Sequence, residues 1–221
     1  IQSYNRKLCY QAILLMTNSC IRPGELKGLR WSDIEPNPNL DKDQQKIGHL
    51  IRIRADNTKV GEPRVVQTPT VNRVKEIMDI TGIKKVRGKP FPSVHSDFAN
   101  QLVFPKFRDR SQPLGVGTWD RCWKEIRELC ADRYWGNKSI SWYSFRHSGI
   151  SFAVSRGVPM LQLSRNCGTG LRYIEDVYYH HESESKSTWE TLTQNRTFYD
   201  QVKDHNQPVE MEQALADVDV D

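Results

Sequence analysis

The residues between Trp142 and His181 carry the side chains of this sequence that are best suited to chemistry. Arg146 lies in a Ser-Phe-Arg-His-Ser run, Thr169 stands between two glycines, and Tyr178 is the first of a tyrosine pair. A guanidinium can donate paired hydrogen bonds to an oxyanion, and a phenolic oxygen can act as a nucleophile once it loses its proton. The stretch fits three core helices with an incidental surface arginine equally well, so taken alone it leaves both interpretations open.

Apolar spacing predicts that three successive helices carry these side chains. The first would end at Gly157, the second would begin at Pro159 and end at Gly168, and residues 171–179 are long enough for a third. The three helices would be packed together. The first has a wide apolar face and the second has apolar residues of its own, namely Phe145, Ile150, Phe152, Ala153 and Val154, then Met160, Leu161 and Leu163.

A second arginine, Arg22, stands where another helix is expected to begin. Residues 3–18 have the apolar spacing of an amphipathic helix, and a polar turn separates them from Pro23. Because proline suits the first turn of a helix, Arg22 would lie just ahead of the helix start, with Glu25 one turn further on. The simplest interpretation is a helix N-terminus with a local ion pair between Arg22 and Glu25.

A small antiparallel sheet is predicted next. Residues 49–54 alternate apolar and basic side chains, which is typical of a half-buried strand, residues 57–62 form a turn, and residues 64–68 are the returning strand. Lys59 would therefore stand on an exposed hairpin, where a lysine usually serves solubility.

The remaining segments are predicted from the same patterns. We expect a polar loop at 36–48, a helix at 71–80, a basic loop at 82–92, a short strand at 102–104, and helices at 119–131 and 187–202. Helices, then a small sheet, then more helices predict an α+β fold that is mostly α, without internal repeats.

The composition indicates a polyanionic partner. The 221 residues contain 32 Lys+Arg and 27 Asp+Glu, a net charge of +5. Five of the acids lie in residues 206–221, which lack Lys and Arg, so residues 1–205 hold 32 bases against 22 acids. A basic body is consistent with nucleic acid binding, although charge alone is weak evidence.

The cysteines and the apolar runs indicate the compartment. The five cysteines are widely spread and include no CxxC pair, which argues against a disulfide framework and against a structural zinc site. The apolar runs are all shorter than the ~20 residues of a membrane span, and no signal peptide is visible, which predicts a soluble cytoplasmic protein. The first residue is Ile, so the chain is expected to be a fragment of a longer protein. The acidic end from residue 206 is expected to be disordered or to be ordered by a partner.

Four motifs in order resemble those of the tyrosine recombinases, the phage integrase family. They are Cys-Ile-Arg-Pro-Gly-Glu-Leu at 20–26, Thr58-Lys59 on the predicted hairpin, Ser-Phe-Arg-His-Ser at 144–148, and Gly168 followed ten residues later by Tyr178. Each motif is weak singly, but their order and element types agree with the family's catalytic domain. The resemblance implies that domain for residues 1–205, a helix at 185–205 exchanged between protomers, and a separate acidic tail at 206–221.

The resemblance also implies a mechanism, which needs neither metal nor cofactor. Tyr178 would attack a DNA phosphate to give a 3′-phosphotyrosyl bond and a free 5′-hydroxyl. Arg22 and Arg146 would bind the non-bridging oxygens, and Lys59 would protonate the leaving oxygen. Tyr178 is chosen over Tyr179 because its spacing from Arg146 and Thr169 is the one that the resemblance requires; helix geometry alone does not decide between the two tyrosines.

Two positions depart from the family pattern. Tyr143 stands where most members have a histidine, and Thr169 where most have histidine or tryptophan. Both can donate a hydrogen bond to phosphate, but tyrosine is a weak base near neutral pH, so the general base stays open. His147 and Glu25 are expected to be structural.

The expected partners are double-stranded DNA and three further copies of the chain in a tetramer on DNA. The expected function is site-specific recombination by an integrase or recombinase. Two alternatives remain: a cleavage-deficient relative that holds DNA, and a type IB topoisomerase-like enzyme acting as a monomer.

Overall fold

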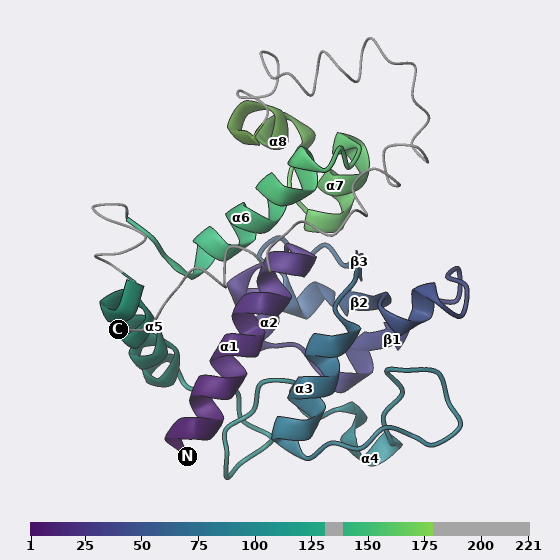
Figure 1. Cartoon of the computed structure of the whole chain (residues 1–221), viewed down its shortest axis with the longest axis vertical. Coiled ribbons are helices and arrows are strands. Elements are labelled where there is room, and N and C mark those ends of the chain that lie inside the picture. Colours follow the sequence, from purple (N-terminus) through teal and green to yellow (C-terminus); the bar gives the residue numbers. More distant parts are fainter. Residues whose placement is uncertain (131–138, 179–221) are drawn as a thin grey trace, which may run out of the picture. The chain divides into compact units, whose positions relative to one another are not determined.

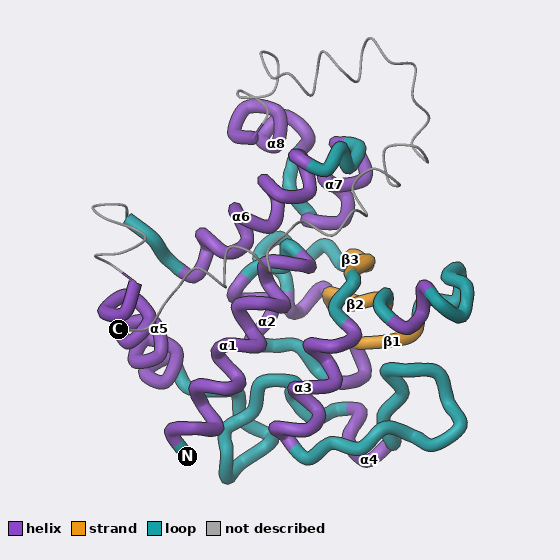
Figure 2. The backbone as a smooth tube through the Cα atoms, viewed as in Figure 1, coloured by secondary structure: helices purple, strands orange, loops and turns teal. Residues whose placement is uncertain are grey.

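A computed structural model of the chain describes residues 1–130 and 139–178, and residues 1–178 form one compact unit. This unit is mostly helical and contains a three-stranded antiparallel sheet, which confirms the α+β prediction (Figures 1 and 2). The predicted helix at 187–202, the exchanged segment at 185–205, the acidic tail and Tyr179 lie outside the described residues. Within the described ranges, the helices are all too short or too polar to cross a membrane.

The first helix supplies the central face of the core. In α1 (Gln2–Ser19) the residues Leu8, Ala12, Leu15 and Met16 recur at helical spacing and are fully buried, as the sequence predicts. The helix ends at Cys20, which takes the left-handed conformation at φ 57° although it is not glycine. This turn redirects the chain into the next short helix.

The sheet follows two short turns of helix. The α2 helix (Pro23–Lys27) and a 3₁₀ turn precede β1 (Ile34–Pro36), which pairs with β2 (His49–Ile53), and β2 pairs with β3 (Arg64–Thr68). The predicted alternation is confirmed in β2, and the returning strand is confirmed as β3: Ile51 and Val66 face each other in register and are both fully buried.

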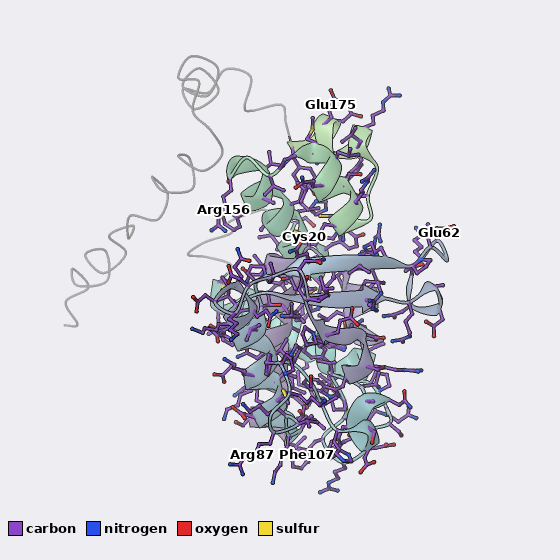
Figure 3. The ribbon with its side chains drawn as sticks, turned by 90° about the vertical axis from the view of Figure 1, so that its right-hand side faces the viewer. Cys20, Glu62, Arg87, Phe107, Arg156 and Glu175 are labelled. Carbon is purple, nitrogen blue, oxygen red and sulfur yellow. The ribbon has the colours of Figure 1, made fainter. Side chains whose placement is uncertain are left out.

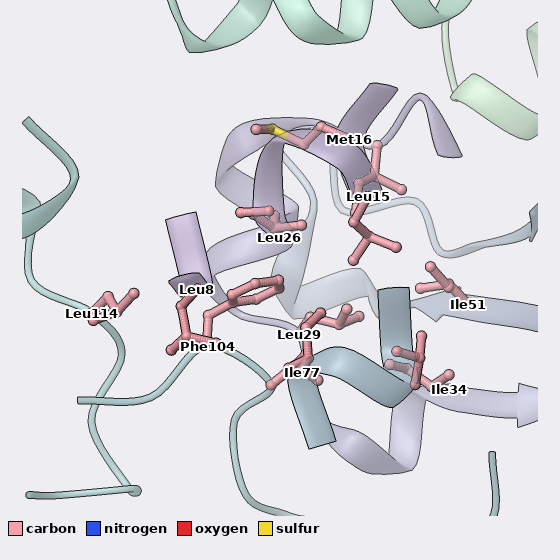
Figure 4. Close-up of a cluster of buried hydrophobic side chains, with 14 of the residues drawn as sticks. Leu8, Leu15, Met16, Leu26, Leu29, Ile34, Ile51, Ile77, Phe104 and Leu114 are labelled. Carbon is pink, nitrogen blue, oxygen red and sulfur yellow. The ribbon is translucent and has the colours of Figure 1, made fainter. Parts of the chain in front are cut away.

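The core lies between α1, the sheet and α3 (Val71–Thr81). Figure 4 shows apolar side chains from the first helices, the sheet and α3 converging on one cluster, together with Phe104 and Leu114 from the later loops. Leu29, Trp31 and Phe104 are among its fully buried members. The buried members of this cluster come from residues 8–122, and the later helices pack against this part of the chain.

Four helices complete the described chain beyond α4 (Ser96–Ala99). They are α5 (Val116–Cys130), α6 (Trp142–Ser155), α7 (Met160–Cys167) and α8 (Leu171–Tyr178). An aromatic cluster holds the start of α6 on α5, with ring centroids of Trp119 and Trp142 5.2 Å apart and those of Trp123 and Phe145 5.9 Å apart. In Figure 1, α6, α7 and α8 lie together above the end of α1.

Several local predictions were wrong. Leu102–Phe104 does not form a strand: Leu102 makes one isolated bridge with Arg30, and the backbone of Val103 bonds to Leu29. The predicted loop at 36–48 overlaps β1 by one residue and contains a 3₁₀ turn, and α4 was not predicted. Phe152 is 58% exposed, because α6 instead turns the face of Arg146, Gly149 and Ile150 toward α1.

Candidate active site

Arg22 is fixed by the helix that it precedes. It is the N-cap residue of α2, Pro23 fills the first helical position, and the Glu25 carboxylate accepts the Arg22 backbone N–H at 2.8 Å. The Arg22 guanidinium bonds to Glu25 through Nη1 at 2.7 Å and to the Gly168 carbonyl through Nη2. The expected local pair between Arg22 and Glu25 is therefore present, and Arg22 also reaches a residue 146 positions away.

Arg146 is fixed by a helix start of its own. Ser141 and Ser144 form a capping box, in which the Ser141 hydroxyl accepts from the Tyr143 N–H and Ser144 accepts from the Ser141 N–H. The helix then carries Arg146 into the interior, where it is 3% exposed. Its Nη1 donates to the Cys20 carbonyl and its Nη2 to the Cys167 carbonyl at 2.9 Å.

The C-terminal end of α7 brings the two arginines together. Arg146 and Arg22 bond to consecutive carbonyls, those of Cys167 and Gly168. The last carbonyls of a helix lack intrahelical partners and carry partial negative charge, so they suit guanidinium groups. Burial lowers the pKa of Arg146, and the positive charge of Arg22 lowers it further. The second effect is expected when two cations lie close together.

A close helix crossing lets Arg146 reach the turn after α1. A Cβ atom at Gly149 would lie 2.1 Å from the Thr17 carbonyl oxygen and 3.1 Å from the Cys20 sulfur. The backbones of α6 and α1 therefore touch at a point that only glycine permits. The left-handed Cys20 then presents its carbonyl to Arg146.

Both predicted tyrosines lie beside this pair of cations. The Arg146 guanidinium lies 6.0 Å from the centre of the Tyr143 ring. The Tyr178 hydroxyl is hydrogen-bonded to Nδ1 of His147, the residue after Arg146. Burial raises the pKa of Tyr178 and Tyr173 adds to the rise, while Arg146 opposes it.

The remaining two predicted residues are placed differently. Thr169 follows Gly168 in the α7–α8 turn, where Ser164 bonds to both its N–H and its carbonyl. Lys59 is exposed in the connection between β2 and β3. Glu62, in the same connection, projects away from Cys20 in Figure 3. The structure thus groups Arg22, Arg146 and the tyrosines, places Thr169 next to them, and leaves Lys59 on a separate loop.

Sequence reasoning missed two contacts of this site. His147 was expected to be structural, yet it bonds to Tyr178. Arg64 was not singled out, yet it forms a two-pronged ion pair with Glu25, at 2.7 and 2.6 Å. A signal existed for Arg64, since it shares the inward register of β3 with Val66 and Thr68, where a charge needs a partner.

The element order and the small sheet are those of the tyrosine recombinase catalytic domain, and the chain has this fold. The match is structural: no family model and no curated protein matches the sequence. The XerH site-specific recombinase bound to its difH substrate in a pre-cleavage complex superposes with a TM-score of 0.55 at 15% identity, covering 86% of this chain and 48% of that one.

Two further solved structures share the fold. The XerA recombinase gives a TM-score of 0.51 at 15% identity, covering 89% of this chain and 65% of that one. The Tn1549 transposon integrase in complex with circular intermediate DNA gives 0.50 at 18% identity, covering 83% and 57%. The chain therefore spans about half to two thirds of the length of these proteins.

Proposed function

We propose that this chain cleaves and rejoins double-stranded DNA through a covalent bond between Tyr178 and a DNA phosphate, as a site-specific recombinase. One observation carries the proposal: Arg22 and Arg146, 124 residues apart in the sequence, bond to consecutive carbonyls, and the residue after Arg146 bonds to the Tyr178 hydroxyl. Two guanidinium groups beside a phenol are suited to phosphoryl transfer.

In this proposal the arginines bind the charge that develops on the phosphate. Each guanidinium has five N–H donors, and the contacts with Glu25 and the three carbonyls use two from each arginine. In the proposal the remaining donors bind the non-bridging oxygens, where preorganised donors contribute several kcal/mol each to transition-state stabilisation. Lys59, on its exposed loop, protonates the 5′-oxygen as it leaves.

His147 is the proton acceptor that the sequence left open. Burial and the charge of Arg146 lower the pKa of His147, so the imidazole is neutral near pH 7 and can accept a hydrogen bond. The Tyr178 phenol, with its raised pKa, needs such an acceptor to become a nucleophile. As Tyr178 attacks phosphorus, its proton passes to Nδ1 of His147, the P–O5′ bond breaks, and the 3′ strand remains bound to the tyrosine.

The partner is proposed from the same comparisons. The XerH recombinase and the Tn1549 integrase are each described in complex with DNA. Together with the predicted polyanion partner, this supports double-stranded DNA as the ligand. Assembly of four copies on that DNA is part of the proposal and rests on the resemblance in the sequence motifs alone.

The test is formation of a covalent adduct with a nicked duplex that carries the candidate recombination site. The unmutated chain should form an adduct that survives denaturing electrophoresis, with the DNA-linked peptide mapping to Tyr178. Tyr178→Phe should lose the adduct and keep DNA affinity, while Tyr179→Phe should retain both.

A second function is a DNA-holding protein without cleavage activity. The raised pKa of Tyr178 and the separate position of Lys59 favour it. An unmutated chain that binds its site tightly but forms no adduct would select this alternative.

A further inference from the structure

One arginine outside the predicted set contacts both groups that hold Arg22. Arg64, the first residue of β3, donates from Nη1 and Nη2 to the two oxygens of Glu25 at 2.7 and 2.6 Å. Its Nε donates to the Asn166 carbonyl at 3.2 Å. Its guanidinium also lies against Gly168, where an added Cβ would be 2.7 Å from Nε and 2.9 Å from Cζ. Glu25 and Gly168 are the residues that accept bonds from the Arg22 guanidinium.

The buried Glu25 carboxylate has its acceptor capacity filled. Oε1 accepts from Nη1 of both Arg22 and Arg64 at 2.7 Å, and Oε2 accepts from the Arg22 backbone at 2.8 Å and from Arg64 at 2.6 Å. Burial alone would raise the pKa of Glu25, but the bonds from the two arginines hold it below its usual value, so the group stays ionised. Because Arg64 occupies one side of the carboxylate, the Arg22 guanidinium reaches it through a single nitrogen.

We propose that Arg64 is a positioning residue, which keeps Arg22 from closing onto Glu25 and so keeps the Arg22 guanidinium directed at the scissile phosphate. The inference rests on the proposed function for its ligand, a phosphate. Without Arg64, Arg22 would be the one cation bonded to Glu25 in the described part of the chain, and a buried carboxylate binds a lone arginine through both nitrogens. Arg22 would then leave the Gly168 carbonyl, and Arg146 would face the phosphate alone.

The same sheet offers a matched control. Arg52 on β2 pairs in register with Val65 of β3 and forms an ion pair with Glu35 at 2.6 Å, but it is 55% exposed. Arg52→Gln therefore removes an arginine–carboxylate pair from this sheet without touching Arg22.

The first measurement is single-turnover cleavage of two nicked duplexes by the full chain. One duplex has a normal scissile phosphodiester and the other a methylphosphonate, which lacks the charged non-bridging oxygen that an arginine would bind. Arg64→Gln should cleave the phosphodiester about 100-fold more slowly, the usual loss for one transition-state donor, with DNA affinity within a few-fold. On the methylphosphonate the loss should shrink to a few-fold.

Arg64→Lys, which keeps the charge but not the two-pronged geometry, should be intermediate, and Arg52→Gln should match the unmutated chain on both duplexes. Equal losses on the two duplexes would mean that Arg64 only maintains the fold, and full activity of Arg64→Gln would also refute the proposal.

The second measurement needs no cleavage. Inorganic phosphate is titrated into the full chain labelled with ¹⁵N, and the Nε–H signals of Arg22 and Arg146 are followed, each assigned by its loss in a lysine variant. Both signals should respond in the unmutated chain and in Arg52→Gln, whereas Arg64→Gln should keep the Arg146 response and lose that of Arg22.

Retention of the Arg22 response in Arg64→Gln, or its absence from the unmutated chain, would overturn the inference. If the titration behaves as expected while the unmutated chain forms no adduct, the positioning role stands and the recombinase proposal fails.

Discussion

Replacing Gly149 with alanine should separate α6 from α1 and withdraw Arg146. The new Cβ would lie 2.1 Å from the Thr17 carbonyl oxygen, whereas ordinary contact begins at 3.4 Å, so the two backbones must part by about 1.3 Å. Thr17 presents backbone here, which a rotamer change cannot move away. The Arg146 bond to the Cys20 carbonyl, made across this crossing, would be broken.

The expected cost follows from these contacts. Overpacking costs about 1–3 kcal/mol and the lost charged hydrogen bond about 1.5–3 kcal/mol, offset by about 1 kcal/mol from the higher helix propensity of alanine. Unfolding in urea should therefore show a loss of about 1.5–5 kcal/mol. Adduct formation by the protein that remains folded should fall about 100-fold, the usual effect of a 1 Å displacement in an active site.

Gly117 provides the control, since it lies in α5 and a Cβ there would meet no atom within 4 Å. Gly117→Ala should leave adduct formation unchanged and stabilise the fold by about 0.5–1 kcal/mol. Wild-type stability together with wild-type adduct formation in Gly149→Ala would show that the close crossing does not position Arg146.

Three further predictions concern titration and proton transfer. Burial lowers the pKa of His49 to about 4, so between pH 7 and 4 the unfolded chain binds a proton that the folded chain does not. The free energy of unfolding should therefore fall by about 3 kcal/mol as the pH drops from 7 to 4. His49→Gln should flatten this pH dependence in urea titrations. Because neutral His147 accepts the Tyr178 proton in our proposal, and burial and Arg146 lower its pKa, single-turnover cleavage should decline only at a pH below the ordinary titration range of histidine. His147→Phe should remove that limb of the pH profile at a reduced rate. Lys59→Ala should be defective on a normal duplex and recover on a 5′-bridging phosphorothioate, whose thiolate leaves without a proton; equal defects on both would return Lys59 to a solubility role.

The sequence predicted those parts of the fold whose information is local. Pro23 and the glycine at 168 fix helix ends within a few residues, and the alternation of β2 is legible because one face is buried and the other is not. The three-residue β1 and the four-residue α4 are too short to show a period, and tertiary contacts decide them.

The site was predictable in its residue types and not in its connections. Arg22 and Arg146 could be singled out from their neighbours in sequence, but the carbonyls that hold them come from Cys20, Cys167 and Gly168. Every residue has a backbone carbonyl, so the residue type does not indicate which carbonyls will accept these bonds. Lys59 illustrates the opposite case, in which a predicted residue lies on a loop that the static structure leaves apart from the others.

Arg22 and Arg146, which together form the proposed phosphate clamp, both bond to carbonyls at the end of α7, and this affects how the clamp can be lost. Both acceptors are backbone carbonyls of adjacent residues, so a change of side chain at Cys167 would leave the two acceptors in place. A shift of α7 would act on both arginines at once, because each donates one bond to its last carbonyls, while Arg22 would keep its bond to Glu25 and Arg146 its bond to Cys20. The position of one eight-residue helix would therefore adjust both guanidinium groups together, whereas a substitution at Arg64 or Gly149 would displace one arginine and leave the other in place.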